Sequence, residues 1–152
     1  MPEPEIRLIR MDDRERVVRF FAQMAPDSRS FFNRRNGNLN WALRYFDGTD
    51  RQAMRRWVAV EGDEMVGYVF LWDTDTMIPW LGIAVAERMR GRHFGQKLIE
   101  TAEAWCRSQG KGGILLTTHM ANVRAQALYE RCGFERLGVY GANNELLYLR
   151  RF

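Results

Sequence analysis

The sequence predicts a mixed α+β domain built on one central sheet. Two observations support this prediction: the first half contains several β-rich segments joined by tight turns, and a strand–helix–strand–helix–strand–strand order follows from residue 77 onward. Such an order packs helices against a sheet rather than against one another in a bundle. The chain has 152 residues, a common size for one domain, so we expect 1–152 to form a single domain.

The N-terminal third combines a strand with short helices. Residues 5–10 alternate apolar and charged side chains, as a first strand does. Asp12 and Glu15 have the spacing of a capping box, and apolar residues then recur at helical spacing. Two further short helices are indicated, at 29–35 and 41–46.

The middle of the chain reads as a run of strands. Segments 57–60 and 65–72 are rich in β-formers, and Glu61-Gly62-Asp63 between them is typical of a tight hairpin turn. A third apolar run, at 77–85, predicts another strand. These segments are expected to pair in antiparallel fashion.

The second half contains two strand–helix units. Residues 94–109 form an amphipathic pattern with one apolar stripe, and this helix connects the strand at 77–85 to a buried strand at 114–118. A helix of that kind is a crossover, so we expect these two strands to be parallel. A second helix, capped by Asn122 and stopped by Gly133, leads into a closing hairpin. The two strands of that hairpin are predicted at 134–139 and 146–151.

Charge and composition limit the classes of binding partner but do not identify one. The formal net charge is +4 and the pI about 9.4, which suits either a polyanionic small ligand or nucleic acid. Cys106 and Cys132 lack metal-ligand spacing, and His93 and His119 are too few and too far apart for a zinc site, so no metal is predicted. No apolar run approaches the roughly 18 residues of a membrane span, and the N-terminus lacks a signal-peptide pattern, so we expect a cytoplasmic protein without a membrane partner.

The helix that follows residue 93 begins without an ordinary cap. Arg92 and His93 occupy the cap positions, and neither offers a carboxylate, hydroxyl or amide to the first backbone N–H groups. Gly91 and Gly95 flank them, and a bound anion can supply the acceptor oxygens at such a helix end. The alternative is a charge-rich turn that water caps. Positive charge around the turn comes from Arg88, Arg90, Arg92 and Lys97.

A second segment favours the anion site. Residues 122–134 match the pattern N-x-x-A-x-x-L-Y-x-x-x-G-F, at Asn122, Ala125, Leu128, Tyr129, Gly133 and Phe134. The earlier segment matches [RQ]-x-x-G-x-[GA] at Arg90 and Gly95, with His93 in place of the central glycine. Together, over residues 77–139, the two segments resemble the GNAT superfamily of acyl-CoA-dependent N-acyltransferases. Of the two conformations open to His93, we expect the helical one, in which its ring adds a donor near the phosphates; the other has a positive φ.

The resemblance implies a fold and a cofactor. Acetyl-CoA would lie where the fourth and fifth strands of a mostly antiparallel sheet splay apart, with helices on both faces of the sheet. It also implies that the pantetheine arm pairs with main-chain groups of the fourth strand, one N–H of which polarises the thioester carbonyl. The residues concerned are Ile83, Ala84 and Val85. The loop amides that would bind the pyrophosphate belong to Arg90, Gly91, Arg92, His93, Phe94, Gly95 and Gln96.

Catalytic roles follow from the same resemblance. Tyr129 matches the tyrosine that protonates the departing CoA thiolate, although an aromatic residue in this stripe also suits the core. Asn122 matches an asparagine that contacts the cofactor arm. Arg124 and Arg131 are either partners of the 3′-phosphate or solvated surface residues. The general base is left open among Asp73, Asp75, Glu87 and His119.

The acceptor is expected to be a primary amine of a small molecule or peptide. The region between the first two helices carries aromatic and arginine side chains that suit an acceptor with apolar and anionic parts, or else serve the core and the surface. They are Phe31, Phe32, Trp41, Tyr45 and Phe46 with Arg34, Arg35 and Arg44. The sequence permits a homodimer without requiring one.

Two other functions compete with acetyl transfer. A catalytically silent CoA-binding or interaction module is suggested by His93 and by the missing base. A nucleic-acid-binding domain is suggested by the basic pI and by arginines interleaved with aromatic residues. The latter is disfavoured, because the sequence has no zinc finger, RRM signature or basic helix.

Overall fold

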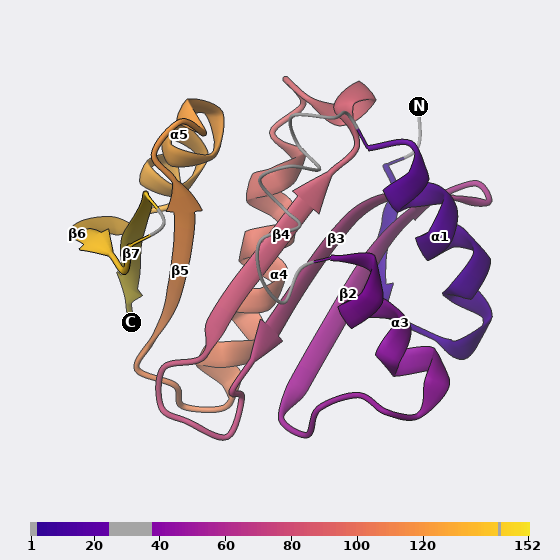
Figure 1. Ribbon diagram of the computed structural model, residues 1–152, viewed down its shortest axis with the longest axis horizontal. Helices are drawn as coiled ribbons and strands as arrows, with labels where there is room; N and C mark the ends of the chain where they lie inside the picture. The colour runs from indigo at the N-terminus through magenta and orange to yellow at the C-terminus, as the bar shows by residue number, and fades with distance from the viewer. Residues whose placement is uncertain (1–2, 25–37, 143) are drawn as a thin grey trace.

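The computed structural model describes residues 3–24, 38–142 and 144–152, and its centre is one seven-stranded sheet (Figure 1). The strand order is β1-β2-β3-β4-β5-β7-β6, and only β4 and β5 pair in parallel. The strands are β1 Glu5–Leu8, β2 Met54–Glu61, β3 Glu64–Trp72, β4 Trp80–Val85, β5 Gly113–His119, β6 Glu135–Tyr140 and β7 Glu145–Arg151. The helices are η1 Met11–Asp13, α1 Arg14–Ala22, α3 Leu39–Asp47, η2 Glu87–Met89, α4 Phe94–Ser108 and α5 Val123–Arg131.

The helices cover both faces of the sheet, as predicted. On one face, Val17 and Phe20 of α1 and Ala42 of α3 pack in one apolar cluster with β2 and β3. On the other face, the stripe of α4 and Tyr129 of α5 join a second cluster. None of the helices in the described part of the chain is long and apolar enough to cross a membrane.

The predicted capping box of Asp12 and Glu15 is wrong. Residues Met11–Asp13 form a 3-10 turn, and the buried carboxylate that organises it belongs to Asp13. Asp13 accepts two hydrogen bonds of 2.8 Å from Arg7 and one of 2.7 Å from the backbone N–H of Arg10. Charge-assisted bonds to a buried carboxylate are stronger than the bonds of an exposed cap.

Local signals predicted α3 well, whereas the helix predicted at 29–35 lies outside the described residues. The segment 41–46 forms most of α3, which begins after Asn38. The Asn38 side chain accepts a 3.1 Å hydrogen bond from the backbone N–H of Trp41, which satisfies one of the free donors at the helix start. Gly48 ends the helix with a φ of 72°.

The strand predicted from residue 77 begins only at Trp80. Pro79 has no N–H to give to a neighbouring strand, so the ladder cannot start before it. The carbonyls of Met77 and Pro79 nonetheless accept hydrogen bonds of 2.9 Å, from the N–H groups of Gly112 and Leu115 respectively. These two bonds tie the beginning of β4 to the beginning of β5.

Beyond that point, β4 and β5 separate. β3 and β4 pair from Trp80 to Val85, but β4 and β5 share the single register pair Trp80–Leu115. Figure 1 shows the two strands diverging from their joined end, with α4 behind β4. The predicted parallel pairing and the predicted splay are both confirmed.

Candidate functional site

The divergence of β4 from β5 leaves main-chain groups facing a gap. The Pro79 carbonyl points at β5, because it accepts a bond from the N–H of Leu115. Main-chain groups alternate sides along a strand, so those of Ile83 and Val85 point toward β5 as well. There they have no register partner in β5. By the same alternation Ala84 turns its N–H and C=O toward Tyr68 of β3 and contributes only its side chain.

The loop at the open end of the gap presents backbone N–H groups. α4 begins at Phe94, and its first four N–H groups, beginning with those of Phe94, Gly95 and Gln96, have no partner inside the helix. The Arg90 N–H is already bonded to the Glu87 carbonyl at 3.0 Å, so its amide is not available to a phosphate. Gly91 has a positive φ of 79°, a conformation that glycine adopts without steric penalty.

The expectation that His93 is helical is wrong. His93 caps α4 with a φ of 56° and a ψ of 26°, which is the left-handed region, and its side chain makes no capping bond. The family pattern places glycine here because a β-carbon in this conformation costs about 1 kcal/mol or more. The turn that opens the helix therefore carries strain in this chain.

That strain gives a direct prediction. We expect His93→Gly to raise the free energy of unfolding by about 1 kcal/mol, because glycine adopts the left-handed conformation without a steric penalty. Urea denaturation of the purified variant measures the change. His93→Ala is the control, since it keeps the β-carbon and is expected to give no such gain. Equal stability of the glycine and alanine variants would contradict the assignment of strain.

Most of the positive charge around this loop is matched by carboxylates. Three of its four cations form ion pairs with acidic residues, most of them distant in sequence. The pairs are Arg88 with Glu61 and Glu64, Arg90 with Glu87, and Lys97 with Glu3. Arg92 makes no ion pair among the described residues and donates only to the sulfur of Met89, at 3.2 Å. The attraction for an anion therefore rests on the amides, the helix dipole and Arg92.

The two motif segments lie against each other in space. A β-carbon built on Gly95 of α4 would lie 2.9 Å from a Cδ atom of Leu128 in α5, so glycine lets these helices approach closely. Asn122 begins α5, and its side-chain oxygen accepts a 3.3 Å bond from the N–H of Ala125. The predicted cap is thus confirmed, and the role of Asn122 at a cofactor stays a prediction.

Tyr129 lies in α5 with its ring in the core. The side chain is 7% exposed, and the ring packs on Phe134 and Tyr148 at centroid distances of 6.0 and 5.9 Å. Burial first, and then the nearby Cys132, Tyr148 and Glu145, raise the pKa of its hydroxyl above the ordinary value. The raised pKa keeps the hydroxyl protonated at neutral pH, and because it has no hydrogen-bond partner among the described residues, its proton is available to a ligand.

The four base candidates do not come together. Asp73 and Asp75 precede β4 and so lie beyond the end at which β4 and β5 are joined; Asp73 is 3.6 Å from Arg51. Glu87 pairs with Arg90. His119 ends β5 at the open end, but its Nδ1 accepts a 3.0 Å bond from the N–H of Ala121, which occupies that lone pair.

The aromatic residues predicted for the acceptor divide in two. Those at 31 and 32, with the arginines at 34 and 35, lie outside the described residues. The others are on α3, where Arg44 stacks 4.5 Å above the ring of Trp41 and the Tyr45 hydroxyl donates to the Ile9 carbonyl at 3.2 Å. Tyr45 packs against the apolar cluster beneath α1 and α3, whereas the ring contacts of Trp41 are with arginine side chains.

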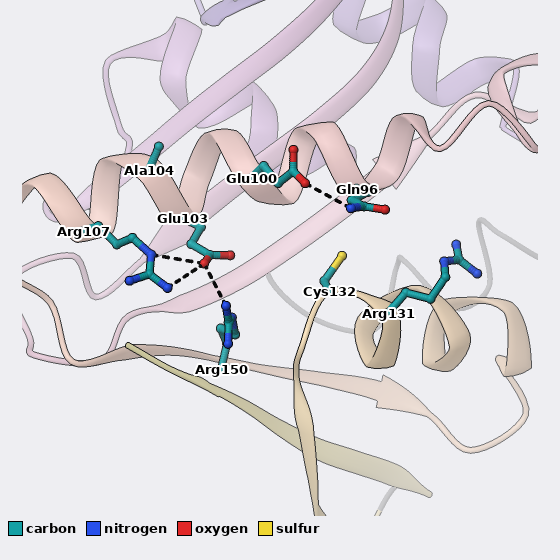
Figure 2. Close-up of a pocket in the computed structure, with 8 residues that line it drawn as sticks. All are labelled: Gln96, Glu100, Glu103, Ala104, Arg107, Arg131, Cys132 and Arg150. Atoms are coloured by element: carbon teal, nitrogen blue, oxygen red, sulfur yellow. Dashed lines mark hydrogen bonds and ion pairs between the residues drawn. The ribbon is translucent and has the colours of Figure 1, made fainter.

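A cavity of about 310 Å³ lies between α4 and α5, and sequence reasoning did not find it (Figure 2). Its lining is rich in charged residues: Gln96, Glu100, Glu103, Ala104, Arg107, Arg131, Cys132 and Arg150. Glu103 pairs with Arg107 at 3.0 Å and with Arg150 at 3.4 Å, whereas Arg131 makes no ion pair within the described part of the chain. In that part, no group of three or more His, Cys, Asp or Glu side chains is placed to hold a metal ion.

Comparison with known proteins identifies relatives. A family model described as "Acetyltransferase (GNAT) family" matches residues 9–134. A mouse (Mus musculus) protein, probable N-acetyltransferase family 8 member 5, is 30% identical over 104 residues, which are 63% of this chain and 45% of that protein. The alignment therefore spans less than half of the mouse protein.

Solved structures share the fold at low sequence identity. The GNAT domain of S. lividans PAT matches with a TM-score of 0.85 at 17% identity, over 98% of this chain and 90% of that one. The PaiA N-acetyltransferase of Thermoplasma acidophilum, solved in complex with coenzyme A, matches with a TM-score of 0.79 at 14% identity, over 99% of this chain and 100% of that one.

Proposed function

The chain belongs to the GNAT acetyltransferase family, and from this premise we propose that it transfers an acetyl group from acetyl-CoA to a primary amine. The acceptor is a small molecule or peptide, which attacks the thioester directly while both substrates are bound. The observation that carries the proposal is the gap between β4 and β5, which opens toward the uncapped start of α4.

In this proposal main-chain groups hold the cofactor. The amides that begin α4 bind the pyrophosphate, because helix N-termini favour anions, and Arg92 adds charge. The pantetheine arm pairs with the main chain of Ile83 and Val85, as a short strand would. The Ile83 N–H donates to the thioester carbonyl oxygen, where negative charge develops in the transition state. Asn122 contacts the arm from the start of α5.

The reaction forms a C–N bond and breaks a C–S bond. The uncharged amine nitrogen attacks the carbonyl carbon, and the tetrahedral intermediate expels the CoA thiolate. Tyr129 donates its proton to that sulfur and regains one from the attacking nitrogen. A raised pKa suits this role, because the tyrosine stays protonated until a thiolate appears beside it.

Arg131 is proposed to contact the 3′-phosphate of CoA, because it is the arginine lining the cavity that lacks an ion pair. Arg124 is a second such candidate. We expect Arg131→Gln to weaken CoA binding about two- to fivefold and to leave 3′-dephospho-CoA binding unchanged, since an exposed ion pair contributes about 0.2–1 kcal/mol. Calorimetry with both ligands measures this. The control is Arg107→Gln, which removes an arginine already paired with Glu103; equal weakening of the two ligands by Arg131→Gln would refute the contact.

Two measurements test the proposal. Acetyl-CoA is expected to raise the melting temperature, because a ligand at 100 times its Kd stabilises the native state by about 2.7 kcal/mol. Inorganic triphosphate at matched ionic strength is the control. A panel of primary amines, including peptides with free N-termini, then tests for thiol release. Acetyl transfer is refuted if no amine in the panel releases thiol.

The same measurements distinguish the competing functions. A silent CoA-binding module, which the strained His93 favours, predicts a thermal shift without thiol release. A nucleic-acid-binding domain predicts no response to acetyl-CoA beyond that to triphosphate, and salt-dependent binding to DNA or RNA.

A further inference from the structure

A row of aromatic rings runs from β3 over β4 to β6, on the face of the sheet away from α4 and α5. Trp72 of β3 stacks on Trp80 of β4 at a centroid distance of 6.0 Å and an interplanar angle of 9°. Trp80 in turn contacts Tyr140 of β6 at 5.7 Å. Trp72 packs against the cluster beneath α1 and α3, which fixes the face. All three rings are half-buried, so they present apolar surface beside the gap.

The row ends beside a buried carboxylate. Glu145 of β7 is 5% exposed and lies in register with Tyr140 of β6 on one side and with His119 of β5 on the other. Residues in register share a face of the sheet. Leu146 and Tyr148 belong to the cluster beneath α4 and α5, so alternation places Glu145 on the face that carries the aromatic row.

Glu145 also lies at the open end of the gap. Its register partner His119 is the last residue of β5, and the strands separate toward that end. Its charge reaches the Tyr129 hydroxyl, where it contributes to the raised pKa of that group. A buried carboxylate therefore lies at the open end of the gap, next to an aromatic ring. Primary ammonium groups on a carbon chain bind well in such surroundings, through an ion pair and cation–π contacts.

We propose that Glu145 binds the ammonium group of the acceptor and accepts its proton, while Trp80 and Tyr140 hold the attached carbon chain. This inference rests on the proposed acetyl transfer and assigns the base that the sequence left open. The ammonium gives one proton to the carboxylate and becomes the nucleophilic amine. After attack, the second nitrogen proton passes to Tyr129 as Tyr129 protonates the thiolate. Glu145 then releases its proton to solvent.

Titratable side chains on three neighbouring elements surround Glu145. His119 on β5 and Tyr140 on β6 are its neighbours across the sheet, and Tyr129 on α5 is within reach of its charge. Because the Nδ1 of His119 accepts the Ala121 N–H, its neutral ring carries its proton on Nε2 and has no free lone pair to act as the base.

The test compares pH profiles of kcat/KM for 2-phenylethylamine, an aromatic primary amine, with acetyl-CoA as the acetyl donor. We expect Glu145→Gln to lower kcat/KM about 100-fold at pH 7 and to make it rise about tenfold per pH unit, because only the free amine then reacts. The wild-type profile is flatter. Glu145→Asp is expected to recover part of the activity. The matched control, Glu135→Gln, removes an exposed carboxylate of β6 and is expected to leave the profile unchanged.

Two further measurements separate the possible failures. Unchanged acetyl-CoA binding by calorimetry shows that the Glu145→Gln variant is folded. Parallel pH profiles for this variant and the wild type overturn the assignment while acetyl transfer stands. If the wild-type protein binds acetyl-CoA but acetylates no amine, the proposed function fails. Tryptophan fluorescence then tests Glu145 separately. Quenching by 2-phenylethylammonium in the wild type but not in Glu145→Gln supports the site. Equal quenching in both proteins, or no quenching in either, overturns it.

Discussion

Tyr129→Phe is expected to lower kcat by about 100-fold while leaving the Kd for acetyl-CoA nearly unchanged. The variant lacks the proton that the departing thiolate needs, but it keeps the ring that packs on Phe134 and Tyr148. Its stability is expected to match that of the wild type, because the hydroxyl forms no hydrogen bond with the described residues. Steady-state thiol release and calorimetry on the same preparations measure the two quantities.

The matched control is Tyr148→Phe, which removes the hydroxyl of a neighbouring buried tyrosine. That hydroxyl donates to Glu130 at 2.9 Å and accepts from Arg136 at 3.2 Å, so its loss is expected to lower stability by about 1 kcal/mol without reducing kcat. The raised pKa of Tyr129 adds a second expectation: activity does not decline through ionisation of Tyr129 anywhere below pH 10. Wild-type kcat in Tyr129→Phe would remove this residue from the mechanism.

Asp13→Ala is expected to lower the free energy of unfolding by about 3–5 kcal/mol, because it removes the buried carboxylate that Arg7 and Arg16 share. The Asp13 side chain is fully buried, and it joins Arg7 and Arg16, whose side chains are 14% and 20% exposed. Urea denaturation at pH 7 measures the loss. The neighbouring Asp12→Ala is the control, because Asp12 is exposed and pairs only with Arg10; a similar loss in both variants would contradict the role of Asp13.

The stability contributed by Asp13 depends on pH in a definite direction. Burial alone raises the pKa of its carboxyl, but the hydrogen bonds from Arg7 and from the Arg10 N–H outweigh burial and hold the pKa below the ordinary value. The unfolded state therefore binds the proton first as pH falls. The contribution is complete above the unfolded pKa of about 3.9 and is lost as pH falls through the folded pKa. The difference between wild type and Asp13→Ala is expected to shrink below about pH 4.

The sequence predicted elements whose cause is local. The stripe of α4 and the cap at Asn122 are set by residues within a few positions of one another, and the crossover rule then predicted the parallel pairing of β4 and β5. The late start of β4 was also readable in principle, because Pro79 cannot donate to a ladder.

Features that depend on distant residues were missed. The sign of φ at His93 is set by how the loop joins η2 to α4, which spacing alone does not reveal. Asp13, rather than Asp12, became the buried carboxylate because β1 brings Arg7 to it. The burial of Glu145 follows from its position between β5 and β6, and a single glutamate before an apolar strand gives no such signal.

The main-chain groups of Ile83 and Val85 face the gap whatever side chains these residues carry. Mutation replaces side chains and leaves N–H and C=O groups in place, and only proline deletes a donor. A site built in this way can drift in sequence over evolution without losing its ligand. Side-chain differences among relatives at these two positions are then set by packing against the cluster beneath α4. Remote relatives are better recognised by the angle between two strands than by residue identity.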